Sequence, residues 1–177
     1  MRERDRSLYV EFVRVRYASL YRTAYLLTGN HHTAEDLVQT TLVKVYVSWG
    51  RVSSAGRPEA YARRMITNEA VTLHRHRWTS EVSTAGPALL AQAGSSPGPE
   101  QAVVDSQVVW EALGHLPARQ RAVVVLRYYD DLSEADIADA LGIAPGTVKS
   151  HAHAALAALG AYLSGGRGGT SMVEEPA

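Results

Sequence analysis

The spacing of apolar residues predicts that the chain begins with a long helix. Between about Ser7 and Leu27, apolar residues recur at intervals that place them on one broad helical face. The members of this face are Leu8, Phe12, Val15, Leu20, Ala24 and Leu27. Gly29 and Asn30 follow directly, and this pair is expected to end the helix.

Two further helices are predicted in the first half of the chain. The second begins at Thr33, which we expect to be its N-cap with Asp36 as the capping partner, and continues to about Ser48. The segment 50–57 is rich in Ser and Gly and predicts a loop. Pro58 fits the first turn of a third helix, which runs to about Trp78.

Helical periodicity returns after residue 104. Helices are predicted over 105–114, from Pro117 to about Tyr129, over 134–141 and from Pro145 to about Leu163. The β-branched run 123–125 lies inside one of these patterns, and no strand-like alternation is long enough to build a sheet. The pattern therefore predicts an all-α fold.

The stretch between the two helical regions has no sustained period and is interrupted by Pro, Gly and Ser. We expect a flexible linker over 79–104, because such a long irregular stretch is unusual inside one compact domain. The division predicts two small helical domains, over 5–78 and 105–163, followed by a disordered tail over 164–177.

A helix-turn-helix is the most specific pattern in the second domain. Ala138 is small enough for two helices to cross closely, and Gly142 tolerates the positive φ of a tight turn. Apolar anchors for the pair are Ile137, Leu141, Ile143, Val148 and Leu156. The second helix would present to the DNA major groove Thr147, Lys149, Ser150 and His153. An ordinary α-hairpin in a bundle is the alternative.

The charge of the chain is neutral in total but unevenly distributed. Eighteen Lys and Arg balance eighteen Asp and Glu. Residues 1–30 hold six Arg against three acids and residues 57–78 hold five Arg against two, whereas 111–143 hold three Arg against six acids. The run Arg75-His-Arg77-Trp78 mixes bases with an aromatic ring, which suits phosphates and stacked bases. A solvated helix face is the alternative interpretation of that run.

Several enzyme classes find no support in the sequence. The chain has no cysteine, so it offers no disulfide, thiolate zinc site or cysteine nucleophile. Phosphate-binding loops, nucleophile elbows, dinucleotide fingerprints and His-Glu-x-x-His motifs are missing as well. The spaced pairs His74/His76 and His151/His153 point away from each other on a helix. We therefore expect no catalytic site, metal or cofactor, and, without a signal segment or membrane span, a cytoplasmic protein.

Two separate blocks of sequence resemble the extracytoplasmic-function (ECF) sigma factors of the sigma-70 family, most closely the actinobacterial SigE family. The second domain carries the resemblance in residues 115–129, 132–138 and 145–150. The first carries it independently in Tyr25-Leu-Leu-Thr-Gly, Ala34-Glu-Asp-Leu-Val-Gln-Thr and 58–70. The resemblance implies a dissociable specificity subunit that binds core RNA polymerase and promoter DNA.

The resemblance also implies roles for residues of the first domain. Asp36 and Gln39 would contact the clamp helices of the polymerase β′ subunit, and a base flipped out of the melted minus-ten strand would enter the loop 51–57. Single-strand contacts would come from Arg63, Arg64, Asn68, Arg75, Arg77 and Trp78. For Tyr61 we favour core packing over stacking.

In the second domain the resemblance implies that the helix-turn-helix reads the minus-thirty-five duplex. The implied contacts are Arg127, Thr147, Lys149, Ser150, His151 and His153. The resemblance also suggests an anti-sigma protein as a further partner. A stand-alone helix-turn-helix regulator, with residues 5–78 as a sensor or dimerisation domain, is the alternative function; it would bind a palindromic duplex without polymerase.

The chain departs from the family after Lys149-Ser150, where relatives usually carry further arginines and this sequence has His151 and Ala154. Protonation of His151 and His153 would restore positive charge, so duplex affinity is expected to be higher at pH 6 than at pH 8. Fluorescence anisotropy with a cognate duplex measures this. Equal affinity at the two pH values would contradict it.

Overall fold

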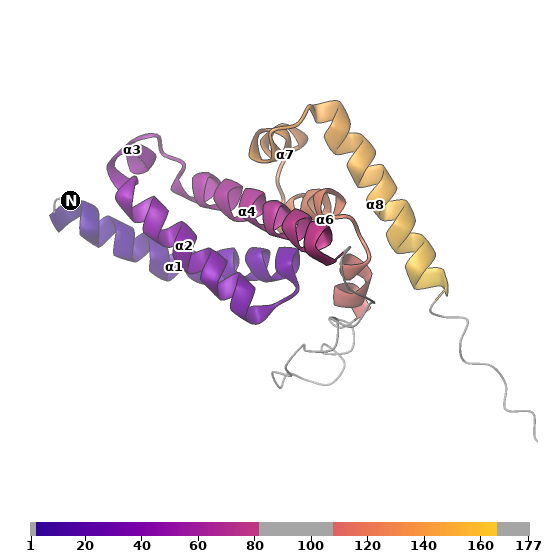
Figure 1. The fold of residues 1–177 in the computed structure, drawn as a ribbon. Coiled ribbons are helices and arrows are strands. Elements are labelled where there is room, and N and C mark those ends of the chain that lie inside the picture. The colour runs from indigo at the N-terminus through magenta and orange to yellow at the C-terminus, as the bar shows by residue number, and fades with distance from the viewer. Residues whose placement is uncertain (1–2, 82–107, 166–177) are drawn as a thin grey trace, which may run out of the picture.

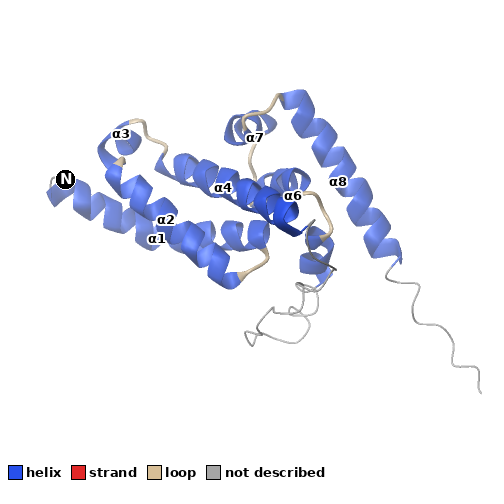
Figure 2. Cartoon of the chain, in the orientation of Figure 1, coloured by secondary structure: helices blue, strands red, loops and turns tan. Residues whose placement is uncertain are grey.

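The computed structural model describes residues 3–81 and 108–165, and these form helices joined by short turns (Figures 1 and 2). The elements are α1 (Glu3–Thr28), α2 (His31–Val47), α3 (Trp49–Ser54), α4 (Pro58–Glu81), a helix over 108–114, α6 (Ala118–Val124), the π-helix η1 (Val125–Tyr129), α7 (Glu134–Leu141) and α8 (Pro145–Gly165). The described residues contain no strand, which confirms the all-α prediction. Most of the expected linker and tail lies outside the described residues.

The junction between α1 and α2 differs from the prediction. The N-cap of α2 is Asn30, whose Oδ1 accepts hydrogen bonds from the backbone N of Thr33 at 2.9 Å and from its Oγ1 at 3.1 Å. The helix therefore starts before Thr33, and Thr33 lies in its first turn. Asn30 can take this role because Gly29, at a φ of 70°, turns the chain after α1.

The segment that was expected to be a loop contains the short helix α3. Its residues Trp49 and Val52 are buried, and the Trp49 ring lies 5.3 Å from Tyr9 and 5.4 Å from Phe12, centroid to centroid. Burying the large Trp49 ring against α1 stabilises α3 more than the Ser and Gly residues of the segment destabilise it. The prediction failed because it used local composition alone.

Helices α1, α2 and α4 pack together as the first bundle, and only part of the predicted α1 face is inside. Leu20, Ala24 and Leu27 are buried, whereas Leu8 and Val15 are 50% and 56% exposed. On α4 the inward residues Ala62 and Ile66 are fully buried.

The helix predicted from Pro117 to Tyr129 is continuous but changes its pitch. It is α-helical in α6 and π-helical in η1, where the backbone N of Asp130 donates to Val125 O at 3.1 Å, five residues back. η1 packs against α1. The wider π-helical turn directs Asp130 toward α1, where its carboxylate accepts a hydrogen bond from Thr23.

Helices α7 and α8 form the predicted helix-turn-helix. Ser133 caps α7 by accepting from Asp136 N at 3.1 Å, and Gly142 ends it at a φ of 62°. Ile137, Ala138 and Val148 are buried between the helices. These local signals are strong enough to be recognised from sequence because caps and turns involve neighbouring residues only.

One predicted anchor of this motif is wrong. Leu156 is 48% exposed, and the inward positions of α8 are Val148, Ala152 and Ala155. Those three follow the spacing of four and three residues that keeps a helical face aligned, and Leu156 lies about 100° away from Ala155.

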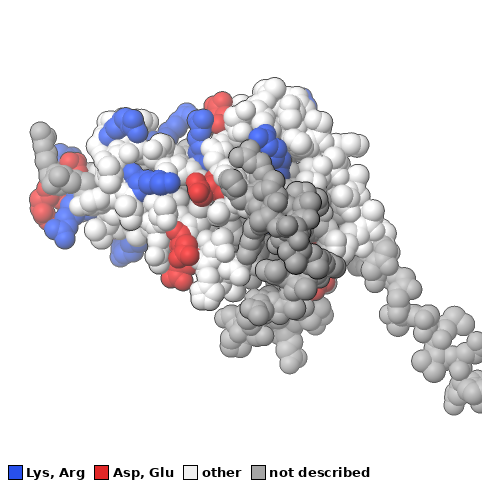
Figure 3. Space-filling view, in the orientation of Figure 1, with Lys and Arg blue, Asp and Glu red and all other residues white. Residues whose placement is uncertain are grey.

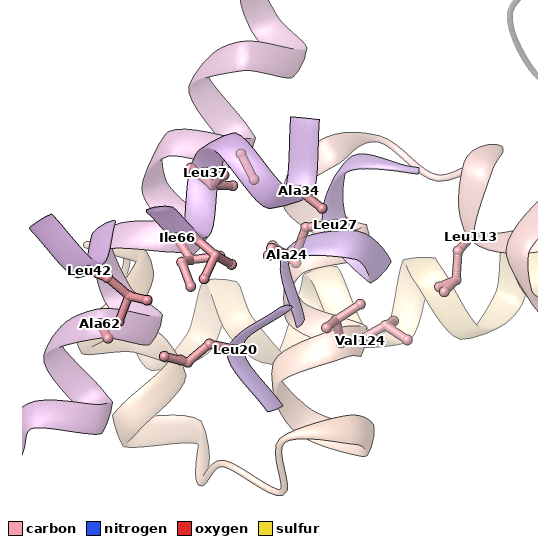
Figure 4. Packing of buried hydrophobic residues seen from close by; sticks show 14 of the residues in the cluster. Leu20, Ala24, Leu27, Ala34, Leu37, Leu42, Ala62, Ile66, Leu113 and Val124 are labelled. Carbon is pink, nitrogen blue, oxygen red and sulfur yellow. The ribbon is translucent and has the colours of Figure 1, made fainter. Parts of the chain in front are cut away.

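The two helical regions bury one common core. Leu20, Ala24 and Ile66 of the first bundle belong to the same cluster as Leu113 and Val124 of the second region (Figure 4). Helix α4 contacts α1 and α2 on one side and α6 and α7 on the other (Figure 1). The regions are thus separate along the sequence but packed against each other in space.

The tight turn of the helix-turn-helix depends on the left-handed backbone at Gly142. Gly142→Ala is expected to lower the free energy of unfolding by about 1 kcal/mol, although an added Cβ would meet nothing within 4 Å, because L-residues disfavour that backbone conformation. Urea unfolding followed by circular dichroism measures the change. The control Gly160→Ala, inside α8 and equally unobstructed, is expected to stabilise by about 0.5–1 kcal/mol. Equal effects of the two substitutions would contradict the explanation.

Candidate functional site

The single-strand candidates on α4 point in two directions. Arg64 and Asn68, one helical turn apart, are exposed on the outer face. Arg63 faces the second helical region, with its side chain only 16% exposed. The side chains of Arg75, Arg77 and Trp78 lie outside the described residues, although the α4 backbone runs through their positions. Of the predicted set, the structure therefore brings Arg64 and Asn68 together and separates Arg63 from them.

Arg63 is held by several partners at once. Its Nη2 lies 2.9 Å from Glu59 Oε1, 3.4 Å from Asp130 Oδ1 and 3.2 Å from Ser19 Oγ. Asp130 comes from the second region and was not singled out from the sequence. Nothing in the sequence could have identified it, because the pairing joins residues far apart in the chain.

Tyr61 is half-buried and packs against the core, as favoured from the sequence. The predicted base-capturing loop lies beside it and consists of the end of α3, a turn with Gly56 at a φ of 70°, and Arg57. Arg51 and Arg57 are both exposed there.

The polymerase-binding candidates Asp36 and Gln39 are exposed on one face of α2. Gln39 Nε2 donates to Glu35 Oε1 at 3.3 Å. The face continues with Val43, 62% exposed, and Val47, 80% exposed. These two valines were missed, although their positions are out of phase with the buried residues of α2, which is a signal the sequence contains. Together Asp36, Gln39, Val43 and Val47 form a mixed polar and apolar stripe, named here the α2 stripe.

The duplex candidates gather at the start of α8. Lys149, Ser150 and His153 are exposed, and Thr147 and His151 are partly exposed. The Ser150 hydroxyl donates within its own helix, to the backbone oxygens of Gly146 and Thr147 at 3.1 Å each.

Glu134, at the start of α7, links two of these cations. Its Oε1 accepts from Arg127 Nη1 at 2.9 Å, and its Oε2 lies 3.6 Å from Lys149 Nζ. The hydrogen bond from Arg127 lowers the pKa of the Glu134 carboxyl, with a further contribution from Lys149. Arg127, whose guanidinium also lies 5.9 Å from the Tyr128 ring centre, is thereby placed on the same side of the motif as Lys149.

Charge on the visible surface is mixed. Figure 3 shows separate basic patches over the α1–α4 part of that face, with acidic groups between them. Within the described residues, no group of three or more His, Asp or Glu side chains is placed to hold a metal ion. No described helix is long and apolar enough to cross a membrane.

Two family models match the chain. The model for sigma-70 region 2 covers residues 12–79, and the model for sigma-70 region 4 covers residues 106–159. The chain belongs to the sigma-70 family and is an ECF RNA polymerase sigma factor.

Curated relatives agree with this assignment over most of their length. The RNA polymerase sigma-E factor of Streptomyces avermitilis is 38% identical over 149 residues, which span 84% of this chain and 81% of the relative. The sigma-E factor of Streptomyces coelicolor is 36% identical, over 84% and 82%. The ECF sigma factor SigL of Mycobacterium tuberculosis is 35% identical, over 87% and 85%.

A solved structure has the same architecture. The sigma factor RpoE from Bartonella quintana, crystallised with the anti-sigma factor NepR, superposes with a TM-score of 0.67 at 27% identity. The match covers 87% of this chain and 95% of that one. In the sigma-70 framework, α2 and α4 belong to region 2, and the helix-turn-helix belongs to region 4.

The Glu134 bridge predicts a measurable effect on duplex binding by region 4. Glu134→Gln is expected to tighten binding of the full chain to duplex DNA of mixed sequence by about threefold at low salt. The reason is that Arg127 and Lys149 no longer have to break ion pairs with the Glu134 carboxylate before they bind phosphate. Anisotropy titrations measure it. The control Asp139→Asn removes an exposed acid of the same motif and is expected to change the affinity less. Weaker binding of Glu134→Gln would instead indicate that the bridge orients the cations for DNA.

Proposed function

We propose that this sigma factor binds core RNA polymerase through the α2 stripe and directs initiation at specific promoters. Region 2 would read the melted minus-ten strand with α4, and region 4 would read the minus-thirty-five duplex with α8. The observation that carries the proposal is that each of the three helices exposes, on a face outside the core, residues that the family pattern assigns to contact. They are Asp36 and Gln39 on α2, Arg64 and Asn68 on α4, and Lys149, Ser150 and His153 on α8.

The α2 stripe has the composition of a docking surface. Asp36 and Gln39 supply polar groups, and Val43 and Val47 supply apolar area that is otherwise exposed to water. Burying two valine side chains is worth about 1.5–3 kcal/mol each, and the polar residues would fix the register. This combination supports a protein partner, and we propose that the partner is the clamp-helix region of the polymerase β′ subunit.

The exposed face of α4 supports contact with a single strand. Extruding a base from the duplex costs a few kcal/mol, which stacking and hydrogen bonds to the base edge have to offset. Asn68 offers an amide for a base edge, and Arg64 offers a guanidinium for phosphate. Arg75, Arg77 and Trp78, further along α4, would extend this contact.

Region 4 would bind DNA in the manner of other helix-turn-helix proteins. The first turns of α8 carry Thr147, Lys149, Ser150, His151 and His153, which would enter the major groove, while Arg127 would contact the backbone or a base from the neighbouring helix. The polymerase would supply the chemistry of RNA synthesis, so this subunit would need no catalytic site of its own. We also propose an anti-sigma partner, because the related Bartonella quintana factor forms such a complex.

Run-off transcription on genomic fragments with core polymerase tests the function. Addition of the protein is expected to produce discrete start sites that share a promoter sequence. Polymerase-independent binding to a palindromic duplex, with no new start sites, would instead support a stand-alone regulator.

The α2 stripe is tested by a matched pair of substitutions. Val43→Asp is expected to weaken binding to core polymerase by about tenfold or more, because it places a charge in a desolvated contact. Val10→Asp makes the same change at a valine of α1 that is 57% exposed, and is expected to bind like the parent protein. Biolayer interferometry with immobilised core enzyme measures both. Equal losses would show that the stripe is not the contact.

A further inference from the structure

We propose that Tyr128, at the end of the helix that precedes the helix-turn-helix, is a further duplex-contact residue of region 4. Its ring supports the guanidinium of Arg127 during DNA binding, and its hydroxyl donates a hydrogen bond to a DNA phosphate. Because Arg127 is itself a proposed DNA contact, this inference rests on the proposed function.

Tyr128 has the largest exposed fraction of any tyrosine among the described residues, at 58%. Single exposed aromatic residues are ordinary on soluble proteins, so exposure by itself indicates no function. The hydroxyl of Tyr128 has no hydrogen-bond partner within the described part of the chain, whereas the hydroxyls of Tyr9 and Tyr21 are bonded inside the fold. Tyr128 therefore offers both a ring and a free donor to a ligand.

The π-helix η1 explains how Arg127 and Tyr128, which are consecutive residues, come into contact. In an α-helix, successive side chains are about 100° apart and do not face each other. The hydrogen bond from Asp130 N to Val125 O closes a wider turn, in which each residue rotates through a smaller angle. The guanidinium carbon of Arg127 thereby lies 5.9 Å from the Tyr128 ring centre, which is within the range of a cation–π contact.

Arg127 is also held by an anion that DNA has to replace. Its Nη1 lies 2.9 Å from Glu134 Oε1 at the start of α7. A DNA phosphate that binds Arg127 competes with this carboxylate, because both are recognised by the same N–H groups. The Tyr128 ring carries no net charge and contacts the face of the guanidinium rather than its N–H edge. Arg127 can therefore exchange the carboxylate for a phosphate while it stays on the ring.

The contacts around Glu134 place Tyr128 beside the cations of the recognition motif. Glu134 Oε2 lies 3.6 Å from Lys149 Nζ, so Arg127 and Lys149 share one carboxylate, and Tyr128 lies against Arg127. Tyrosine hydroxyls are among the groups that contact phosphates in protein–DNA complexes. A neutral donor displaces no counterion, so the hydroxyl adds affinity without adding to the salt dependence of binding. This property distinguishes its contribution from that of Arg127.

Tyr128→Ala and Tyr129→Ala form a matched pair. Tyr129 is the next residue and is 43% exposed, but it makes no cation–π contact with a described residue. In anisotropy titrations of the full chain with duplex DNA of mixed sequence at low salt, Tyr128→Ala is expected to bind about tenfold more weakly than the parent, and Tyr129→Ala like the parent. Circular dichroism checks that both remain helical. Equal affinities of the two variants, or no measurable duplex binding by the parent, would overturn the proposal.

Tyr128→Phe keeps the ring and removes only the hydroxyl. It is expected to weaken binding by about threefold and to leave the slope of log affinity against log salt unchanged, whereas Arg127→Gln reduces that slope by about one. An affinity of Tyr128→Phe equal to that of the parent removes the hydroxyl contact, and it overturns the proposal if Tyr128→Ala does not fold.

A double-mutant cycle tests the support of Arg127 by the ring. In the Arg127→Gln background, Tyr128→Ala is expected to cost only the threefold of the hydroxyl, because no guanidinium is left for the ring to hold. A tenfold loss in that background would show that Tyr128 acts independently of Arg127, as a merely structural residue does, and would overturn the supporting role.

Run-off transcription with core polymerase separates this inference from the proposed function. If the parent directs discrete start sites and Tyr128→Ala binds duplex DNA like Tyr129→Ala, only the inference fails. If the parent directs no start sites, while Tyr128→Ala still binds the duplex more weakly than Tyr129→Ala, the proposed function fails and the DNA contact of Tyr128 stands.

Discussion

The arrangement of the molecule depends on the double packing of α4. Its inward side carries Ala62, Ile66 and Ala70, spaced one turn apart and buried in the core that the two regions share. The same helix contacts α6 and α7 of region 4. Arg64 and Asn68 lie on a part of α4 that these contacts leave exposed. The position of each arginine around α4 therefore decides whether it can reach a ligand or is held by the protein.

Charge burial explains why the contact between the regions is specific. Arg121 is buried, and burial lowers its pKa, but it faces backbone oxygens at helix ends, where the dipole favours a cation. Asp130 has matched side-chain partners. Buried ionic groups add little net stability, yet they disfavour alternative dockings in which they would be unpaired. The apolar part of the shared core supplies the attraction, and the charges fix the orientation.

The helix-turn-helix shows the opposite balance, because short-range features dominate it. The Ser133 cap, the positive φ of Gly142 and the crossing at Ala138 all involve neighbours in sequence. Its small separate core of Val123, Leu126, Ile137 and Val148 is formed within region 4. The exposed face at the start of α8 is thus set mainly by packing within region 4.

Periodicity, caps and turn residues were enough to predict an all-α fold and the motif from Ser133 to Val148. The family was predicted from the resemblance of two separate sequence blocks, in the regions that the two family models match. Local composition was not enough for α3, because its helix depends on burial of Trp49 against Tyr9 and Phe12. It also could not separate Arg63 from Arg64, or identify Asp130 as a partner, since these depend on which side of α4 meets another part of the chain. Sequence determines patterns along a helix, whereas only the tertiary structure decides which face is covered, because packing partners come from distant segments.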